Sequence, residues 1–124
     1  MTSTVQTLAP AYPIIEVTHS GKVTAQDLRA SAKEALGLAR DMDAFHLLTD
    51  CTDLTDAPDD IALLALGDTL RTVSAGMDFR QALLWPTDAE ARLAVDFWQT
   101  AETDFGAKAK VFSHRDAAIE WLTA

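Results

Sequence analysis

The sequence predicts a small α/β domain with a mostly parallel sheet. Short apolar runs typical of strands alternate along the chain with longer segments whose apolar residues recur at helical spacing. Strands that alternate with helices imply crossover connections, which join parallel strands and are right-handed. With 124 residues, 48% of them hydrophobic, the chain is long enough for one domain with a substantial core.

Four segments are predicted as strands: residues 14–18, 45–48, 79–85 and 108–112. β-Branched residues favour the first, and the continuous apolar end of the third is typical of a strand covered on both faces. The two lysines of the fourth indicate an edge or a mouth of the sheet. Residues 1–13, which contain two prolines, are predicted to be a tail or an edge segment before a domain at 14–124.

Each predicted strand is followed by a predicted helix. The residues expected to open the four helices are Thr24, Pro58, Thr87 or Asp88, and Ser113. Asp27 places a negative charge in the first turn of the first helix, where it interacts favourably with the positive end of the helix dipole. Gly106 stands where a glycine usually closes a helix, at the end of the third.

The second and third helices have unusually wide apolar faces. Residues 61–66 are apolar nearly all round the helix, so burying one face would leave Ile61 or Leu64 in water. The third helix is widened in the same way over residues 93–98. These faces predict a cover, which could be a dimer partner, another helix or an apolar ligand.

Composition excludes several classes of partner. The net charge is −9, whereas nucleic acids and anionic membrane surfaces both require a basic face. No apolar run approaches the roughly 20 residues of a membrane span, so an integral membrane protein is not expected. The single cysteine, Cys51, cannot form an internal disulfide, and we expect a cytoplasmic location.

An aspartate-rich segment follows the predicted central strand. It is interpreted as a polar loop at the strand end, and its candidate residues are Asp50, Asp53, Asp59 and Asp60. Their spacing fits no calcium loop. A phosphatase-type pair would need two aspartates two positions apart, whereas Asp50 and Asp53 are three apart. A receiver-like site would need an acidic pair after the first strand, and no such pair is present there. Turn and cap chemistry is therefore favoured, and no catalytic residue, metal or cofactor is predicted.

The histidines and the cysteine give no nucleophilic or zinc site. His19, His46 and His114 do not stand at a metal-ligand spacing and none accompanies Cys51 in a zinc motif. A Cys51–His46 nucleophile pair is conceivable, but nothing in the sequence orients it.

Several motifs resemble a known family. They are Gly21-Lys-Val-Thr24, Leu47-Leu-Thr-Asp50, and Val111-Phe112 followed by Asp116-Ala117-Ala-Ile-Glu-Trp121-Leu122. In this order they resemble the SpoIIAA-like proteins of the STAS group (sulphate transporter and anti-sigma factor antagonist) over residues 12–123. The resemblance implies a four- to five-stranded sheet with about four helices, similar in shape to lipid-carrying CRAL-TRIO domains.

The family resemblance implies two kinds of function. One is a protein-interaction switch controlled by phosphorylation of a serine at the start of the second helix. The other is binding of a small apolar ligand under the helices. Residues 56–60 here read Asp-Ala-Pro-Asp-Asp, without the hydroxyl that the switch requires.

We therefore predict a non-enzymatic binding module for a small apolar or amphipathic, lipid-like ligand. The ligand would lie between the sheet and the helices that begin near Pro58 and Asp88. Its predicted binding residues are Leu64, Leu66, Trp85, Phe97 and Trp98. The alternative is a protein-interaction or regulatory module, expected to be a homodimer, that uses the same faces. An enzyme is the third class, and it would require Asp50 or Asp53 to carry chemistry.

Overall fold

A computed structural model of the chain describes residues 3–7, 13–43, 46–75 and 78–124. In these residues it contains one five-stranded sheet and four helices, so the predicted α/β, SpoIIAA-like fold class is confirmed. Of the predicted segments, residues 1–2 and 8–12 of the tail and Phe45 of the second strand lie outside the described residues.

The strands lie side by side in the order in which they occur in the chain. They are β1 (Ser3–Thr7), β2 (Ile14–Lys22), β3 (His46–Asp56), β4 (Arg80–Leu84) and β5 (Lys108–Phe112). Strands β2 to β5 are parallel, and β1 pairs antiparallel with β2 at one edge. Strand β5 forms the other edge, as its two lysines predicted.

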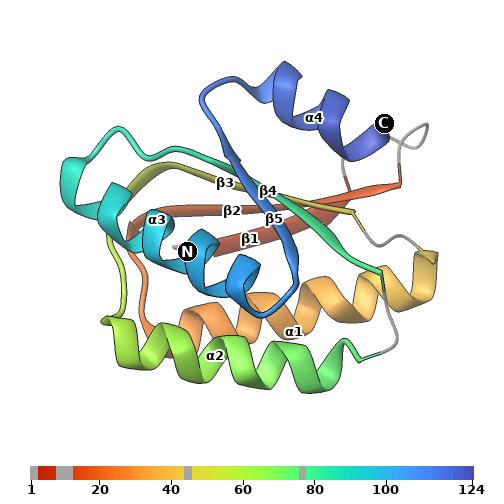
Figure 1. The fold of residues 1–124 in the computed structure, drawn as a ribbon, viewed down its shortest axis with the longest axis horizontal. Helices are drawn as coiled ribbons and strands as arrows, with labels where there is room; N and C mark the ends of the chain where they lie inside the picture. The colour runs from red at the N-terminus through yellow and green to blue at the C-terminus, as the bar shows by residue number, and fades with distance from the viewer. Residues whose placement is uncertain (1–2, 8–12, 44–45, 76–77) are drawn as a thin grey trace.

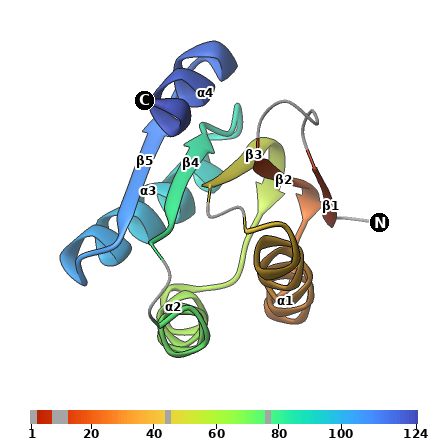
Figure 2. The ribbon, with the colours of Figure 1, turned by 90° about the vertical axis from the view of Figure 1, so that its right-hand side faces the viewer.

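Three helices cover one face of the sheet and one covers the other (Figures 1 and 2). On the first face lie α1 (Ala25–Met42), α2 (Asp60–Val73) and α3 (Ala89–Asp104), and on the second lies α4 (Arg115–Thr123). Because α1, α2 and α3 are successive crossovers between neighbouring parallel strands, a common hand places them on one side. The helix α2 packs between α1 and α3.

Side-chain caps account for three of the four helix starts. The Thr24 hydroxyl accepts from the Asp27 amide at 3.1 Å, and the Asp27 carboxylate accepts from the Thr24 amide at 3.0 Å, forming a capping box. Asp59 and Asp88 cap α2 and α3. The prediction that Pro58 opens the second helix is wrong, because the helix begins at Asp60 and the Asp59 carboxylate accepts from the Ala62 amide. The prediction that Ser113 caps the last helix is wrong, because its N-cap is His114, which makes no side-chain cap bond.

Two strands extend further than predicted. The interpretation of the aspartate-rich segment as a loop is wrong as far as Asp56, and β2 continues beyond residue 18, because Thr49 to Asp56 of β3 pair with Val17 to Lys22 of β2. Thr49 and Cys51 are buried at alternate positions, and Leu54 is buried after the register shift. An irregular register near Ser20 and a positive φ of 66° at Gly21 accommodate the extra length.

The core divides between the two faces of the sheet. Under α4 the buried residues are Ile14, Leu48, Ala82, Leu84, Ala118 and Leu122. On the opposite face, one cluster centred on Val95 and Leu83 packs under α3, and another centred on Val17 and Ala35 packs under α1. The region between these two clusters, beneath α2, contains the candidate site.

Candidate ligand cavity beneath helix α2

A cavity of about 200 Å³ lies between the sheet and the three helices α1, α2 and α3. Most of its wall is apolar, and it includes Val17, Leu36, Leu47, Leu66, Leu70 and Leu83. A cavity of about 150 Å³ with apolar walls is large enough to hold benzene. The space beneath α2 is therefore large enough for a small organic ligand.

A chain of three hydrogen-bonded side chains crosses the wall of this cavity. The Trp98 Nε1–H of α3 donates to Gln81 Oε1 of β4 at 3.1 Å, and Gln81 Nε2 donates to Thr49 Oγ1 of β3 at 2.9 Å. Thr49 is only 6% exposed. Since the indole can only donate, it fixes which end of the Gln81 amide faces each neighbour.

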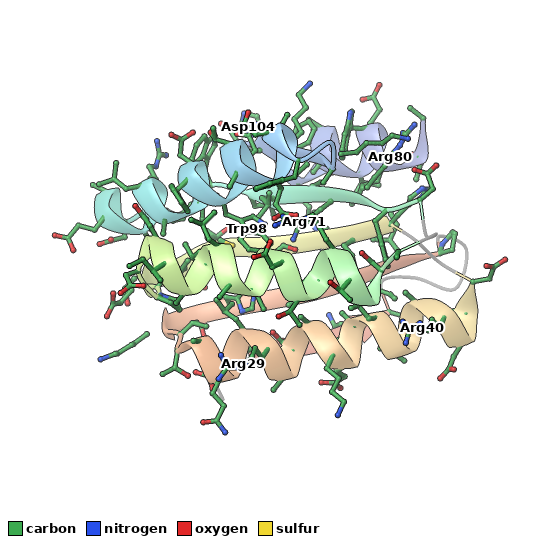
Figure 3. All side chains as sticks on the ribbon, turned by 60° about the horizontal axis from the view of Figure 1, so that its bottom comes forward. Arg29, Arg40, Arg71, Arg80, Trp98 and Asp104 are labelled. Atoms are coloured by element: carbon green, nitrogen blue, oxygen red, sulfur yellow. The ribbon has the colours of Figure 1, made fainter. Side chains whose placement is uncertain are left out.

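An ion pair joins α2 to α3 at the cavity wall. Arg71 Nη1 lies 3.0 Å from Glu102 Oε1, Arg71 also pairs with Asp68, and its guanidinium stands 3.9 Å from the centre of the Phe105 ring. Burial raises the pKa of Glu102, against the opposing effect of Arg71. Gly67 makes room for this pair, because a Cβ there would lie 2.6 Å from Glu102 Oε1. Figure 3 labels Arg71 and Trp98 in this region.

Other polar groups in the wall are held neutral or paired. Burial lowers the pKa of His19 to about 4, and its Nδ1 lies 2.8 Å from Ser3 Oγ. Burial raises the pKa of the Cys51 thiol to about 12, so the thiolate needed for nucleophilic chemistry does not form at neutral pH. Lys108 pairs with Asp78 at 3.0 Å.

The five residues predicted to bind ligand do not all lie together. Leu66 and Trp98 line the cavity beneath α2. Leu64 is 41% exposed on α2 and Phe97 lines a separate groove between α2 and α3. Trp85 lines a polar hollow at the carboxyl ends of the strands. The structure thus brings two of the five residues together.

The groove between α2 and α3 has an acidic rim. Its volume is about 500 Å³, and Leu93, Ala94 and Phe97 line it together with four carboxylates, those of Asp56, Asp60, Glu90 and Asp96. Leu93 is 72% exposed, and Ile61, next to Asp60 in the chain, is 79% exposed. An exposed apolar side chain within a groove rimmed by polar residues is typical of an interaction site.

The four candidate aspartates have separate local environments. Asp50 lies in β3, where its Oδ1 accepts from the Thr52 amide at 3.0 Å and its Oδ2 lies 3.9 Å from Arg115 Nη1. Asp59 caps α2 through the Ala62 amide at 2.9 Å. Asp53 is exposed in β3, and Asp60 lines the acidic groove.

The polar hollow near Trp85 has a volume of about 370 Å³, and its charged lining residues are Asp50, Arg92 and Arg115. Arg115 enters it from α4 and pairs with Glu16 and Asp50. Arg92 donates to the Pro86 carbonyl oxygen at 2.8 Å and lies 5.6 Å from the centre of the Trp85 ring. Among the described residues, no group of three His, Cys, Asp or Glu side chains is placed to hold a metal ion.

Sequence reasoning did not identify Thr49, Gln81, Arg71 or Glu102 as cavity residues. Two of them could have been found from the sequence pattern. Thr49 stands two residues after Leu47, and Gln81 two residues before Leu83, so each polar residue shares a strand face with an apolar one. A polar side chain at such an inward position needs a partner inside the protein. The partner of Gln81 is Trp98, which is distant in sequence.

Searches with family models and with the sequences of characterised proteins gave no match. Solved structures are similar in fold. The anti-sigma factor antagonist SpoIIAA in its unphosphorylated form matches with a TM-score of 0.60 at 12% identity over 98% of each chain. An uncharacterised DUF3478 protein with a SpoIIAA-like fold from Shewanella loihica PV-4 matches with a TM-score of 0.57 at 17% identity, over 97% of this chain and 91% of that one.

These likenesses show the fold, which is the SpoIIAA-like fold of STAS modules. At such low identities they carry no residue roles from one chain to the other. In the described parts of the chain, no helix has both the length and the apolar character needed to cross a membrane.

Proposed function

We propose that the protein is a non-enzymatic binding module that holds a small apolar or amphipathic ligand beneath helix α2. The observation that carries this proposal is the cavity of about 200 Å³ between the sheet and α1, α2 and α3. A well-packed small domain leaves few voids of this size, because protein interiors are close-packed. Ligand sites in proteins combine mainly apolar walls with a few fixed polar groups, as this cavity does.

The absence of activated groups in the described wall supports binding over catalysis. Cys51 is held as a thiol, His19 is held neutral, and Glu102 is occupied by Arg71. Catalysis would need a nucleophile with an adjacent base, or a general acid and base close to a substrate. The described cavity residues provide hydrogen-bonding and apolar contacts instead.

Mass spectrometry of the purified protein under native and denaturing conditions tests the proposal. We expect extra mass that leaves when the protein is denatured. Replacing Leu66, which lines the cavity, by tryptophan should fill the space and reduce the ligand-bound fraction severalfold. The matched control is Leu64→Trp on the exposed side of the same helix, which should leave the bound fraction unchanged.

Equal loss of ligand in both tryptophan variants would place the ligand outside the cavity. If the wild-type protein carries no extra mass and binds no added apolar compound, the proposal is wrong. Thermal unfolding of both variants serves as the control for folding.

A protein-interaction module is the second candidate, and the groove between α2 and α3 favours it. Leu93 lines this groove and is exposed, and four carboxylates line the groove with it. Charge complementarity favours a basic partner chain, because a second copy brings the same acidic rim to the contact. Asp59 stands at the start of α2 with its carboxylate engaged as the N-cap, so a serine-phosphorylation switch is not part of this proposal.

A cationic amphipathic helical peptide tests the second candidate. Its binding should weaken steeply as salt is raised and should fall at least about tenfold in Leu93→Glu, since the change removes an apolar contact and buries a charge against the apolar face of the peptide. Met42→Glu, at an exposed apolar residue on α1, is the matched control. Binding that is equal in the two variants would contradict an interface at the groove.

A further inference from the structure

We propose that the cavity selects a ligand with one uncharged hydrogen-bonding head group, such as an alcohol, aldehyde or ketone, and that Gln81 is the residue that recognises it. This inference rests on the proposed ligand-binding function. It follows from which donors and acceptors of the polar wall residues are hydrogen-bonded within the protein and which are available to a ligand.

The orientation of Gln81 is fixed by its two neighbours. Trp98 can only donate, so the amide oxygen of Gln81 faces the indole at 3.1 Å and the amide nitrogen faces Thr49 at 2.9 Å. This arrangement uses one of the two N–H groups of the amide and one lone pair of its oxygen. No described residue other than Trp98 and Thr49 is hydrogen-bonded to the Gln81 side chain.

The same bonds leave a donor on Thr49. Its hydroxyl oxygen accepts from Gln81, so its own O–H points elsewhere and has no acceptor among the described residues. Thr49 and Gln81 both line the cavity, where the walls around them are Leu47, Leu83 and the Trp98 ring. An oxygen atom of a ligand can therefore accept a hydrogen bond from either side chain within apolar surroundings.

The charged groups of the wall disfavour an anionic head group. The two described cations there are Arg71, which is paired with Glu102 at 3.0 Å and with Asp68, and Lys108, which is paired with Asp78. A carboxylate entering the cavity would have to displace one of these partners or remain uncompensated. Burial of an unpaired charge is far more costly than burial of a hydroxyl or carbonyl group with a hydrogen-bond partner.

Three probes with the same phenyl skeleton separate the contributions of apolar contact, hydrogen bonding and buried charge: toluene, benzyl alcohol and benzoate. Their affinities for the full chain can be measured at neutral pH by ligand-observed NMR titration. We expect benzyl alcohol to bind at least about tenfold more tightly than benzoate, which is ionised at that pH. Toluene reports the apolar contribution alone.

The variant Gln81→Leu tests the role of the amide. It should weaken benzyl alcohol about tenfold relative to toluene, because an apolar side chain of similar size removes the donor and leaves the apolar contacts. Retained toluene binding shows that the variant still forms the cavity. Gln26→Leu, on the exposed side of α1, is the matched control and should change none of the three affinities.

The outcomes distinguish the two proposals. Benzoate binding as tightly as benzyl alcohol, or an unchanged ratio of benzyl alcohol to toluene in Gln81→Leu, would overturn the inference about the head group and leave the cavity as a binding site. Failure of all three probes to bind the wild-type protein would overturn both.

Discussion

At the scale of single residues, His19 makes folding sensitive to mild acid. It is 6% exposed, next to Ser3 of β1, and burial lowers its pKa to about 4. The unfolded chain takes up the proton near pH 6.5, whereas the folded protein resists it until about pH 4. Stability linked to His19 is therefore complete above pH 6.5 and is lost as the pH falls between these values.

We expect the free energy of unfolding to fall by about 2 kcal/mol between pH 7 and pH 5 because of this residue. Urea unfolding at the two pH values measures the loss. In His19→Gln, which keeps a hydrogen-bonding side chain near Ser3 Oγ, the loss should be smaller by about that amount. An equal pH dependence in the wild type and the variant would show that His19 is protonated in the folded state.

At the same scale, Glu102 makes stability depend on pH in the opposite direction to His19. Its pKa is raised by burial, so the folded protein holds this proton more strongly than the unfolded chain does. Its contribution to stability is greatest in acid and declines as the pH rises through the pKa of the folded state. We expect Glu102→Gln, which keeps an oxygen acceptor for Arg71, to gain stability relative to the wild type as the pH rises from 4 to 7. A relative loss over that range, measured by thermal unfolding, would show that the Arg71 charge outweighs burial.

At the scale of elements, Gly67 of α2 leaves room for the ion pair between Arg71 and Glu102 of α3. Glycine inside a helix usually costs about 0.5–1 kcal/mol relative to alanine. A Cβ at Gly67 would lie 2.6 Å from Glu102 Oε1, whereas a Cβ at Gly37 of α1 would meet no atom within 4 Å. The two glycines occupy the same kind of helical position and differ in what faces them.

We expect Gly37→Ala to stabilise the protein by about 0.5–1 kcal/mol, and Gly67→Ala to destabilise it because Glu102 is pushed away from Arg71. Combining Gly67→Ala with Glu102→Ala should recover the stability that alanine adds over glycine inside a helix, since the obstructing carboxylate is gone. Chemical denaturation of the single and double variants measures the coupling. A stabilising Gly67→Ala with the Arg71–Glu102 pair intact would contradict this account.

The elements also show which parts of the structure the sequence could predict. Thr24 and Gly106 were correctly placed at helix ends, and Asp88 is one of the two caps predicted for α3, because capping depends on neighbours in the chain. The extension of β3 was missed because the segment after Leu48 has polar side chains of the kind found in turns, and beyond Asp50 it is a strand through pairing with β2. Such pairing is a tertiary effect that overrides local preference.

The candidate site was only partly predictable for a related reason. The wide apolar face of α2 indicated something to be covered, but residues 61–66 are apolar on several sides and did not show which side faces the sheet. The structure turns Leu66 toward the cavity and leaves Leu64 partly exposed. Recognition of Gln81 required knowing that β4 lies against α3, which brings it to Trp98.

At the scale of the whole molecule, charge opposes self-association through the groove between α2 and α3. The chain carries a net charge of −9, and four of its carboxylates line that groove. Bringing two copies together there doubles the local negative charge while covering the exposed Leu93. Repulsion between exposed charges weakens with salt, whereas apolar attraction does not, so the balance depends on ionic strength.

We therefore expect a monomer in dilute buffer, with self-association appearing only as the salt concentration approaches about 1 M, where the Debye length falls to about 3 Å. Sedimentation velocity across a salt series measures this. Leu93→Glu should abolish the association, because it adds a charge at the centre of the apolar contact, and Met42→Glu on α1 should not. A homodimer that persists in dilute buffer and survives Leu93→Glu would place the self-contact on another face and leave the acidic groove free for a basic partner.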